Sequence, residues 1–111
     1  FMMEGGDIEN NDGTGGYSIY GKEFEDENFK LNHNEEGILS MSNIGSNTNT
    51  SKFIITFSAC QWLNGRNVVF GKVRKGLDCL KEIENKILTD KSDRPLEDVE
   101  IVSCGEIFKK L

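Results

Sequence analysis

The sequence is poor in the residues that usually mark metal sites and disulfide frameworks. It holds one histidine, one tryptophan, one proline and three cysteines among 111 residues. Cys60, Cys79 and Cys104 are odd in number and lack CxxC spacing, which argues against a disulfide framework or a thiolate zinc site and fits a reducing compartment. The lone histidine, His33, lies in a polar stretch and is expected to be solvated. No metal or cofactor is therefore predicted.

A long apolar run is also missing, which argues against a membrane-spanning helix. The first residues, Phe1 to Glu4, lack the basic flank and apolar stretch of a signal peptide. With 36% apolar and 29% charged residues, the chain is one domain or part of one. We therefore expect a soluble chain in the cytoplasm or the nucleus, with no membrane partner.

Positive charge is scarce in the first third of the sequence. Residues 1–36 hold ten acidic side chains against two basic ones, and the remaining residues hold nine acidic against eleven basic. An acidic surface repels phosphate backbones, so a basic groove for nucleic acid is not expected. A solvated acidic face is the favoured interpretation.

The apolar periodicity is mostly that of a β protein with one helix. Short apolar or alternating runs, bounded by glycine and polar loops, predict strands at Phe1–Glu4, Gly37–Asn43, Phe53–Ser58, Val68–Arg74 and Asp98–Cys104. Apolar residues at three- and four-residue spacing predict a helix from Leu77 to about Ile87. Pro95 lies in the loop before the last strand, where no ladder donor is lost.

Ordered sequence blocks resemble the cyclophilins, a family of peptidyl-prolyl cis-trans isomerases. The blocks are Gly5-Gly6-Asp7, Gly13-Thr14-Gly15-Gly16, Ser18-Ile19-Tyr20-Gly21, Phe24-Glu25-Asp26-Glu27-Asn28-Phe29, Gly37-Ile38-Leu39-Ser40-Met41, Trp62-Leu63-Asn64-Gly65 and Val68 through Val73. The resemblance implies a mainly β fold, a closed antiparallel β-barrel capped by helices. It places residues 1–111 in the C-terminal two-thirds of that single domain, with one helix.

The resemblance also implies an activity, faster rotation about X-Pro peptide bonds in the service of protein folding, on proline-containing peptides or proteins. It places the family's catalytic arginine upstream of Phe1. Arg66, Arg74 and Arg94 fall in a turn, a strand end and a distal loop of the family pattern, so they are not expected to replace it. The alternative is a catalytically poor cyclophilin-like module that binds protein without efficient turnover.

Several residues fall on substrate-binding positions of the family. Phe1, Met2, Phe53, Ile54 and Leu63 match the proline pocket, and Asn43 matches the position whose backbone pairs with substrate. Trp62 stands where the family's tryptophan helps to bind cyclosporin, although a tryptophan in a turn can equally be a structural plug. For Phe53 and Leu63, ordinary core packing explains an apolar side chain equally well.

The sequence departs from the family at that same site. Glu4 and Lys52 stand at glutamine positions, Ile54 replaces an aromatic residue, Asn67 replaces histidine and Ile44 replaces a small residue. Glu4 introduces a carboxylate that would disfavour acidic substrates and pair with the upstream arginine. The departures predict weakened or redirected isomerase activity.

Two short segments are similar to the small spliceosome-associated cyclophilins. They are Lys81–Asn85 and Val102–Glu106. This similarity would imply a protein partner in a ribonucleoprotein. An arginine just before Phe1 would support catalysis, whereas its absence would support the binding module.

Overall fold

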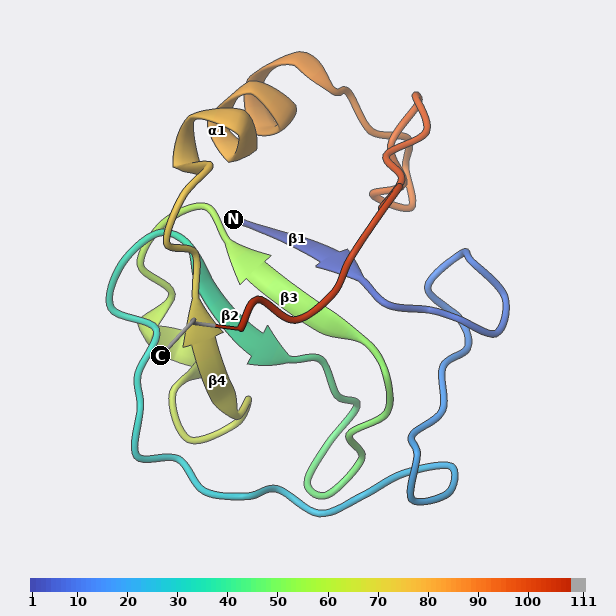
Figure 1. Cartoon of the computed structure of the whole chain (residues 1–111), viewed down its shortest axis with the longest axis vertical. Coiled ribbons are helices and arrows are strands. Elements are labelled where there is room, and N and C mark those ends of the chain that lie inside the picture. The colour runs from blue at the N-terminus through green and yellow to red at the C-terminus, as the bar shows by residue number, and fades with distance from the viewer. Residues whose placement is uncertain (109–111) are drawn as a thin grey trace.

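The computed structural model describes residues 1–108, and its centre is a four-stranded antiparallel sheet in the order β1-β3-β2-β4 (Figure 1). The elements in chain order are β1 (Met2–Gly5), β2 (Ile38–Met41), β3 (Phe53–Thr56), a 3-10 helix (Gln61–Leu63), β4 (Val69–Lys72) and α1 (Leu77–Lys86). The mainly β character with one α-helix is confirmed. β1 and β4 are the edges of an open sheet, so the described strands do not close into a barrel.

The core is small and partly polar. Ile38, Ile54, Cys60 and Val68 are its buried apolar residues. Burial alternates along β2 and β3, as expected for strands with one covered face. Hydrogen bonds compensate the buried hydroxyl of Thr56, which accepts the backbone N–H of Ile38 at 3.0 Å. The centre of the sheet therefore depends on paired polar groups as well as on apolar contact.

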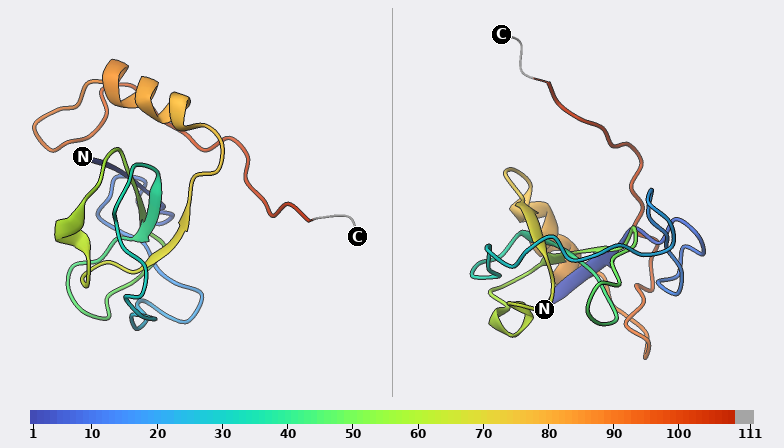
Figure 2. Two further views of the ribbon diagram at one scale, coloured as in Figure 1. Left: turned by 90° about the vertical axis from the view of Figure 1, so that its left-hand side faces the viewer. Right: turned by 90° about the horizontal axis from the view of Figure 1, so that it is seen from below.

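The first four predicted strands are confirmed, β1 shifted by one residue to Met2–Gly5 and the other three within shorter limits, but the fifth is wrong. No strand forms at Asp98–Cys104, and Ile101 and Val102 are exposed there. An alternating sequence forms a strand only when another strand supplies hydrogen-bond partners, and none within residues 1–108 pairs with this segment. Figure 2 shows the segment running away from the body of the molecule as an extended chain.

The predicted helix is confirmed as α1. Its apolar residues Leu77, Leu80 and Ile83 are half-buried, and the side chains between them are exposed. Leu77 packs over Gly37, where a Cβ atom would come within 2.7 Å of the leucine methyl group. Lys81 pairs with Glu36 at 3.6 Å, which ties α1 to the start of β2. Within the described residues, no helix combines the length and apolarity required to span a membrane.

Asp7 organises the loop that follows β1. Its carboxylate oxygens accept the backbone N–H groups of Glu9, Asn10, Asp12, Gly13 and Gly15. These donors, that of Asn10 foremost, hold the pKa of the Asp7 carboxyl well below its usual range. The folded loop presents the carbonyl of Gly13 to the Lys52 ammonium, which donates to it at 3.0 Å. The loop is thereby fixed beside the end of β1.

Candidate functional site

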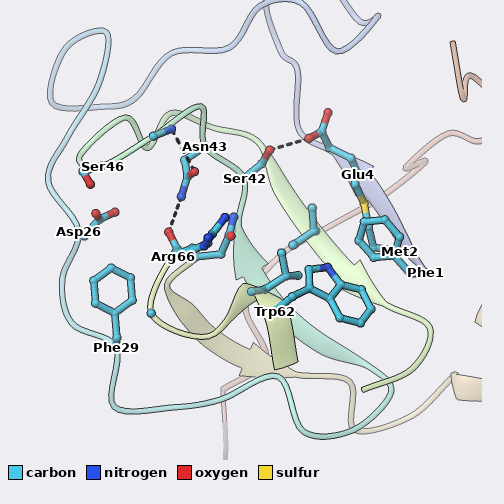
Figure 3. A pocket seen from close by; sticks show the side chains of 15 residues that line it. Phe1, Met2, Glu4, Asp26, Phe29, Ser42, Asn43, Ser46, Trp62 and Arg66 are labelled. Carbon is cyan, nitrogen blue, oxygen red and sulfur yellow. Dashed lines mark hydrogen bonds between the residues drawn. The ribbon is translucent and has the colours of Figure 1, made fainter. Parts of the chain in front are cut away.

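A pocket of about 530 Å³ lies over β1 and β3, between the segment after β2 and the turn after the 3-10 helix (Figure 3). This volume suits a small ligand or one or two residues of a peptide. The side chains that line it come from three parts of the chain: Met2, Glu4 and Ile54 from the sheet, with Phe1 just before it; Asp26, Phe29, Ser42, Asn43 and Ser46 from loops; Trp62 and Leu63 from the 3-10 helix, with Arg66 and Asn67 from the turn after it.

Strand register makes the floor of the pocket. Glu4 on β1 and Ser40 on β2 both lie opposite Ile54 on β3, so the three side chains form one row on one face. Ile54 is 3% exposed and gives the floor an aliphatic surface. Phe1 closes one side, where its ring meets Trp62 edge to face with centroids 5.4 Å apart.

Glu4 carries a carboxylate into the rim of the pocket. The Ser42 hydroxyl donates a 2.5 Å hydrogen bond to Glu4 Oε2, and Figure 3 shows both residues on the rim. Glu4 is exposed, so its charge meets both solvent and any bound peptide. The hydroxyl fixes the direction of the carboxylate without neutralising it. The proposed pairing of Glu4 with an upstream arginine stays a prediction.

Two asparagines join the turn to the end of β2. Asn43 Nδ2 donates to the carbonyl of Arg66 at 2.8 Å, and Asn67 Nδ2 donates to the carbonyl of Met41 at 2.9 Å. Figure 3 shows Arg66 between Asn43 and Trp62. The side chain of Arg66 also lines the pocket, although the sequence argument set it aside. The turn is thereby held at a fixed place beside the floor.

Eight of the eleven substrate-binding residues expected from the sequence line the pocket: Phe1, Met2, Glu4, Asn43, Ile54, Trp62, Leu63 and Asn67. The other three do not. Ile44 is 85% exposed, and Lys52 reaches toward the loop after β1. Phe53 points to the other face of β3, where its ring packs against Gly5 and Gly6. Substrate contact by these three stays a prediction.

Four further side chains line the pocket that the sequence did not predict: Asp26, Phe29, Ser42 and Ser46. Asp26 and Asn47 exchange side-chain to backbone hydrogen bonds of 2.9 and 3.0 Å, which bring the segment with Asp26 and Phe29 to the pocket. A pairing over 21 residues leaves no periodic signal in sequence. Ser42 carried one signal, since it follows Ser40 by two residues and so extends the same face of β2.

The chemistry of the site is that of a binding pocket with a polar rim. Glu4 and Asp26 are its acidic side chains and Arg66 is its basic one. Across residues 1–108, no three His, Cys, Asp or Glu side chains gather into a group that could hold a metal ion. An aliphatic floor, an aromatic side and carbonyl and amide groups at the rim suit an apolar residue within an extended peptide.

Comparison with known proteins shows which family the chain resembles. The family model described as "Cyclophilin type peptidyl-prolyl cis-trans isomerase/CLD" matches residues 1–106. The chain is 51% identical over 110 residues to "Peptidyl-prolyl cis-trans isomerase 9" of Caenorhabditis elegans, which covers 99% of this chain and 35% of that protein. It is 50% identical over 107 residues to the "Peptidyl-prolyl cis-trans isomerase, rhodopsin-specific isozyme" of Calliphora vicina, covering 96% and 45% respectively.

The fold is thus mainly β and carries a pocket whose size suits part of a peptide. The chain belongs to the cyclophilin-type peptidyl-prolyl cis-trans isomerase family. It spans 35% and 45% of the length of these two relatives.

Proposed function

We propose that the protein carrying this chain is a peptidyl-prolyl cis-trans isomerase that accelerates rotation about X-Pro bonds in peptides and proteins. The observation that carries this proposal is the pocket, in which Ile54 and Leu63 supply apolar surface beside a polar rim. Family membership supports the same activity over the binding module without turnover. Neither a nucleophile nor a metal ion is needed for this reaction.

The physical demand of the reaction matches such a pocket. Resonance in an X-Pro bond sets a rotation barrier of ~18–20 kcal/mol. An apolar floor holds the proline ring away from water, while a donor to the prolyl nitrogen favours the pyramidal, twisted state over either planar one. Lowering the barrier by ~7 kcal/mol accelerates rotation roughly a hundred-thousand-fold.

From the family resemblance, we expect the donor to be an arginine that precedes Phe1 in a longer chain. Phe1 and Met2 line the pocket, so a residue just before them would lie at its rim. The side-chain amide of Asn43 donates a hydrogen bond to the Arg66 carbonyl. We therefore propose that the backbone of Asn43 pairs with substrate. We also propose that strands from the rest of a longer protein pair with β1 and β4 and close the barrel.

Cyclosporin is a second proposed ligand of the same pocket. Trp62 is 57% exposed and lies at the pocket edge against Phe1, where a cyclic peptide could contact it. The spliceosomal partner stays a prediction. Neither Lys81–Asn85 nor Val102–Glu106 contributes to the pocket. We propose a cytoplasmic or nuclear location, because the three free cysteines suit a reducing compartment.

A matched pair of leucine variants tests the proposed function. Leu63 lines the pocket and Leu80 lies on α1, and both side chains are half-buried. In the full-length protein, Leu63→Ala should lower kcat/KM on an X-Pro tetrapeptide roughly ten-fold, because truncation removes apolar contact with the proline ring. Leu80→Ala should leave it nearly unchanged. Equal values for the two variants, or no acceleration by the parent protein, would reject the proposal.

A further inference from the structure

A polar cluster of His33, Ser40 and Asn64 lies beside the pocket and takes no part in binding as described above. His33 and Ser40 are 0% exposed, so the expectation that His33 is solvated is wrong. Its ring lies between two polar side chains, with Nδ1 2.9 Å from Asn64 Oδ1 and Nε2 2.8 Å from Ser40 Oγ. Burial of an imidazole without such partners would be costly, which is why hydrogen bonds accompany it here.

The hydrogen bonds fix which ring nitrogen carries the proton. Asn64 Oδ1 also accepts the backbone N–H of His33 at 2.7 Å, so the amide atom facing the ring is the oxygen. An oxygen acceptor requires a donor, and therefore Nδ1 carries the hydrogen. Nε2 then faces Ser40 Oγ, 2.8 Å away. The Ser40 hydroxyl also lies 3.2 Å from the carbonyl of Val68, to which it can donate.

The main chain of His33 holds the segment that carries Trp62 and Leu63. The His33 carbonyl accepts the N–H of Cys60 at 2.8 Å, at one end of that segment. The Asn64 side chain accepts two hydrogen bonds from His33 at the other end. Both ends of residues 60–64 are thus tied to one residue.

The ring of His33 connects the same segment to the pocket floor. Ser40, whose hydroxyl lies within hydrogen-bond distance of Nε2, lies directly opposite Ile54 in the paired strands β2 and β3. The chain of contacts therefore runs from Ile54 through Ser40 and His33 to Asn64 and the turn. It runs through a buried His33–Ser40 hydrogen bond and partly buried His33–Asn64 hydrogen bonds.

The Ser40, His33 and Asn64 side chains have the composition of a hydrolytic triad but not its accessibility. The Ser40 hydroxyl is 0% exposed, and none of the three side chains lines the pocket. A nucleophile must reach its substrate, so this cluster cannot act on a bound peptide. Its role is to hold neighbouring segments in place.

We infer that His33 is a positioning residue for the pocket, which sets the place of Trp62 and Leu63 relative to Ile54 through its Nδ1–H bond to Asn64. The inference rests on the proposed function for its effect on substrate, but not for the arrangement itself. Loss of the Asn64 acceptor frees the turn at one end, so the wall of the pocket should sample several positions. Substrate affinity should fall, because part of the binding energy is then used to order the wall.

The test compares Asn64→Leu with Asn64→Asp in the full-length protein. Asp retains an oxygen that accepts both hydrogen bonds from His33, whereas Leu retains none. Asn34→Leu is the control, since it makes the same change at an exposed neighbour of His33. Three readouts are needed: the imidazole tautomer from ¹⁵N NMR, the indole N–H signal of Trp62, and the Kd of an X-Pro tetrapeptide.

We expect Nδ1 to carry a hydrogen in the parent protein, and a roughly ten-fold higher Kd in Asn64→Leu. The indole signal should broaden or split in that variant, while Asn64→Asp and Asn34→Leu keep the parent values. An Nε2–H tautomer in the parent protein overturns the inference, as does Asn64→Leu with parent Kd and a single sharp indole signal.

If Asn64→Leu does not fold, Asn64→Ala replaces it. If the parent binds no peptide, the proposed function fails and the indole signal alone decides the inference.

Discussion

The sheet region (residues 1–74) and the C-terminal region (residues 77–108) differ in how they use their apolar residues. Every buried residue of the described chain lies in the sheet region, and α1 buries none. The pocket is lined entirely from the sheet region. Yet Ile101 and Val102 are as apolar as Ile54, which shows that burial here follows from available partners and not from composition.

The contrast teaches where the site obtains its rigidity. Contacts between segments distant in sequence, such as Glu4 with Ser42 and His33 with Asn64, surround the pocket. In the C-terminal region, the hydrogen bonds are local, as in the turn closed by Asp90 and Arg94. Matched substitutions in the two regions should therefore have different effects on the pocket.

Thiol labelling should give the largest difference. Cys60 is 0% exposed and burial raises the pKa of its thiol, whereas Cys79 and Cys104 are exposed. In the 111-residue chain, we expect Cys60 to react with iodoacetamide on the order of 100-fold more slowly, because it reacts only after local opening. Mass spectrometry of a time course measures each rate. Equal rates for the three cysteines would abolish the distinction between the regions.

Refilling the pocket floor should have the next largest effect. Ile54→Phe combined with Asn67→His restores two residues typical of the family and adds a flat ring surface under the proline. We expect kcat/KM on an X-Pro tetrapeptide to rise about 2- to 10-fold in the full-length protein. Ile83→Phe on α1 is the matched control and should not raise it. No gain in the double variant would show that these departures do not limit the rate.

Removal of the rim charge should have a smaller effect. Glu4→Gln keeps an oxygen that can accept the Ser42 hydroxyl but abolishes the negative charge. Peptides with an acidic residue beside proline should then gain about two- to five-fold in kcat/KM at low salt, and less at high salt. Glu82→Gln on α1 removes the same charge away from the pocket. An identical preference in Glu4→Gln and the parent would place the carboxylate outside the substrate's reach.

The two loop aspartates should give the smallest and most local effect. Hydrogen bonds from the backbone lower the pKa of Asp7, and those from Arg94 and Ser92 lower the pKa of Asp90. Because both folded pKa values lie below the unfolded one, each contribution to stability is complete above about pH 4 and is lost as pH falls further.

We expect Asp7→Asn to destabilise the fold more than Asp90→Asn, since Asp7 accepts five backbone N–H groups and Asp90 accepts two. The difference between parent and Asp7→Asn should be constant near neutral pH and shrink in acid. Urea unfolding at several pH values measures it. A difference that grows toward low pH would contradict the assigned direction of the pKa.

Periodicity predicted the strands and the helix well because each is a local pattern. It failed at Asp98–Cys104, where a strand-like sequence finds no partner in the described chain. For the site, the resemblance identified residues on strands and on the 3-10 helix, such as Ile54 and Trp62. It did not reveal Asp26 or Phe29, which depend on the pairing of two loops.

His33 shows most clearly what sequence alone could not supply. Its neighbours in the chain are polar, which predicts exposure, yet Ser40 and Asn64 enclose it from seven and 31 residues away. Burial of a polar side chain is decided by the partners that the fold delivers, and these leave no local signature.

We propose that the pocket in the sheet region binds proline and accelerates its isomerisation. NMR exchange spectroscopy of an X-Pro tetrapeptide with the isotope-labelled full-length protein tests this function, because it reports the exchange rate and the perturbed residues together. We predict faster cis-trans exchange, with shifts at Met2, Ile54 and Trp62 and none along α1. Unchanged exchange, or shifts confined to the C-terminal region, would contradict the claim.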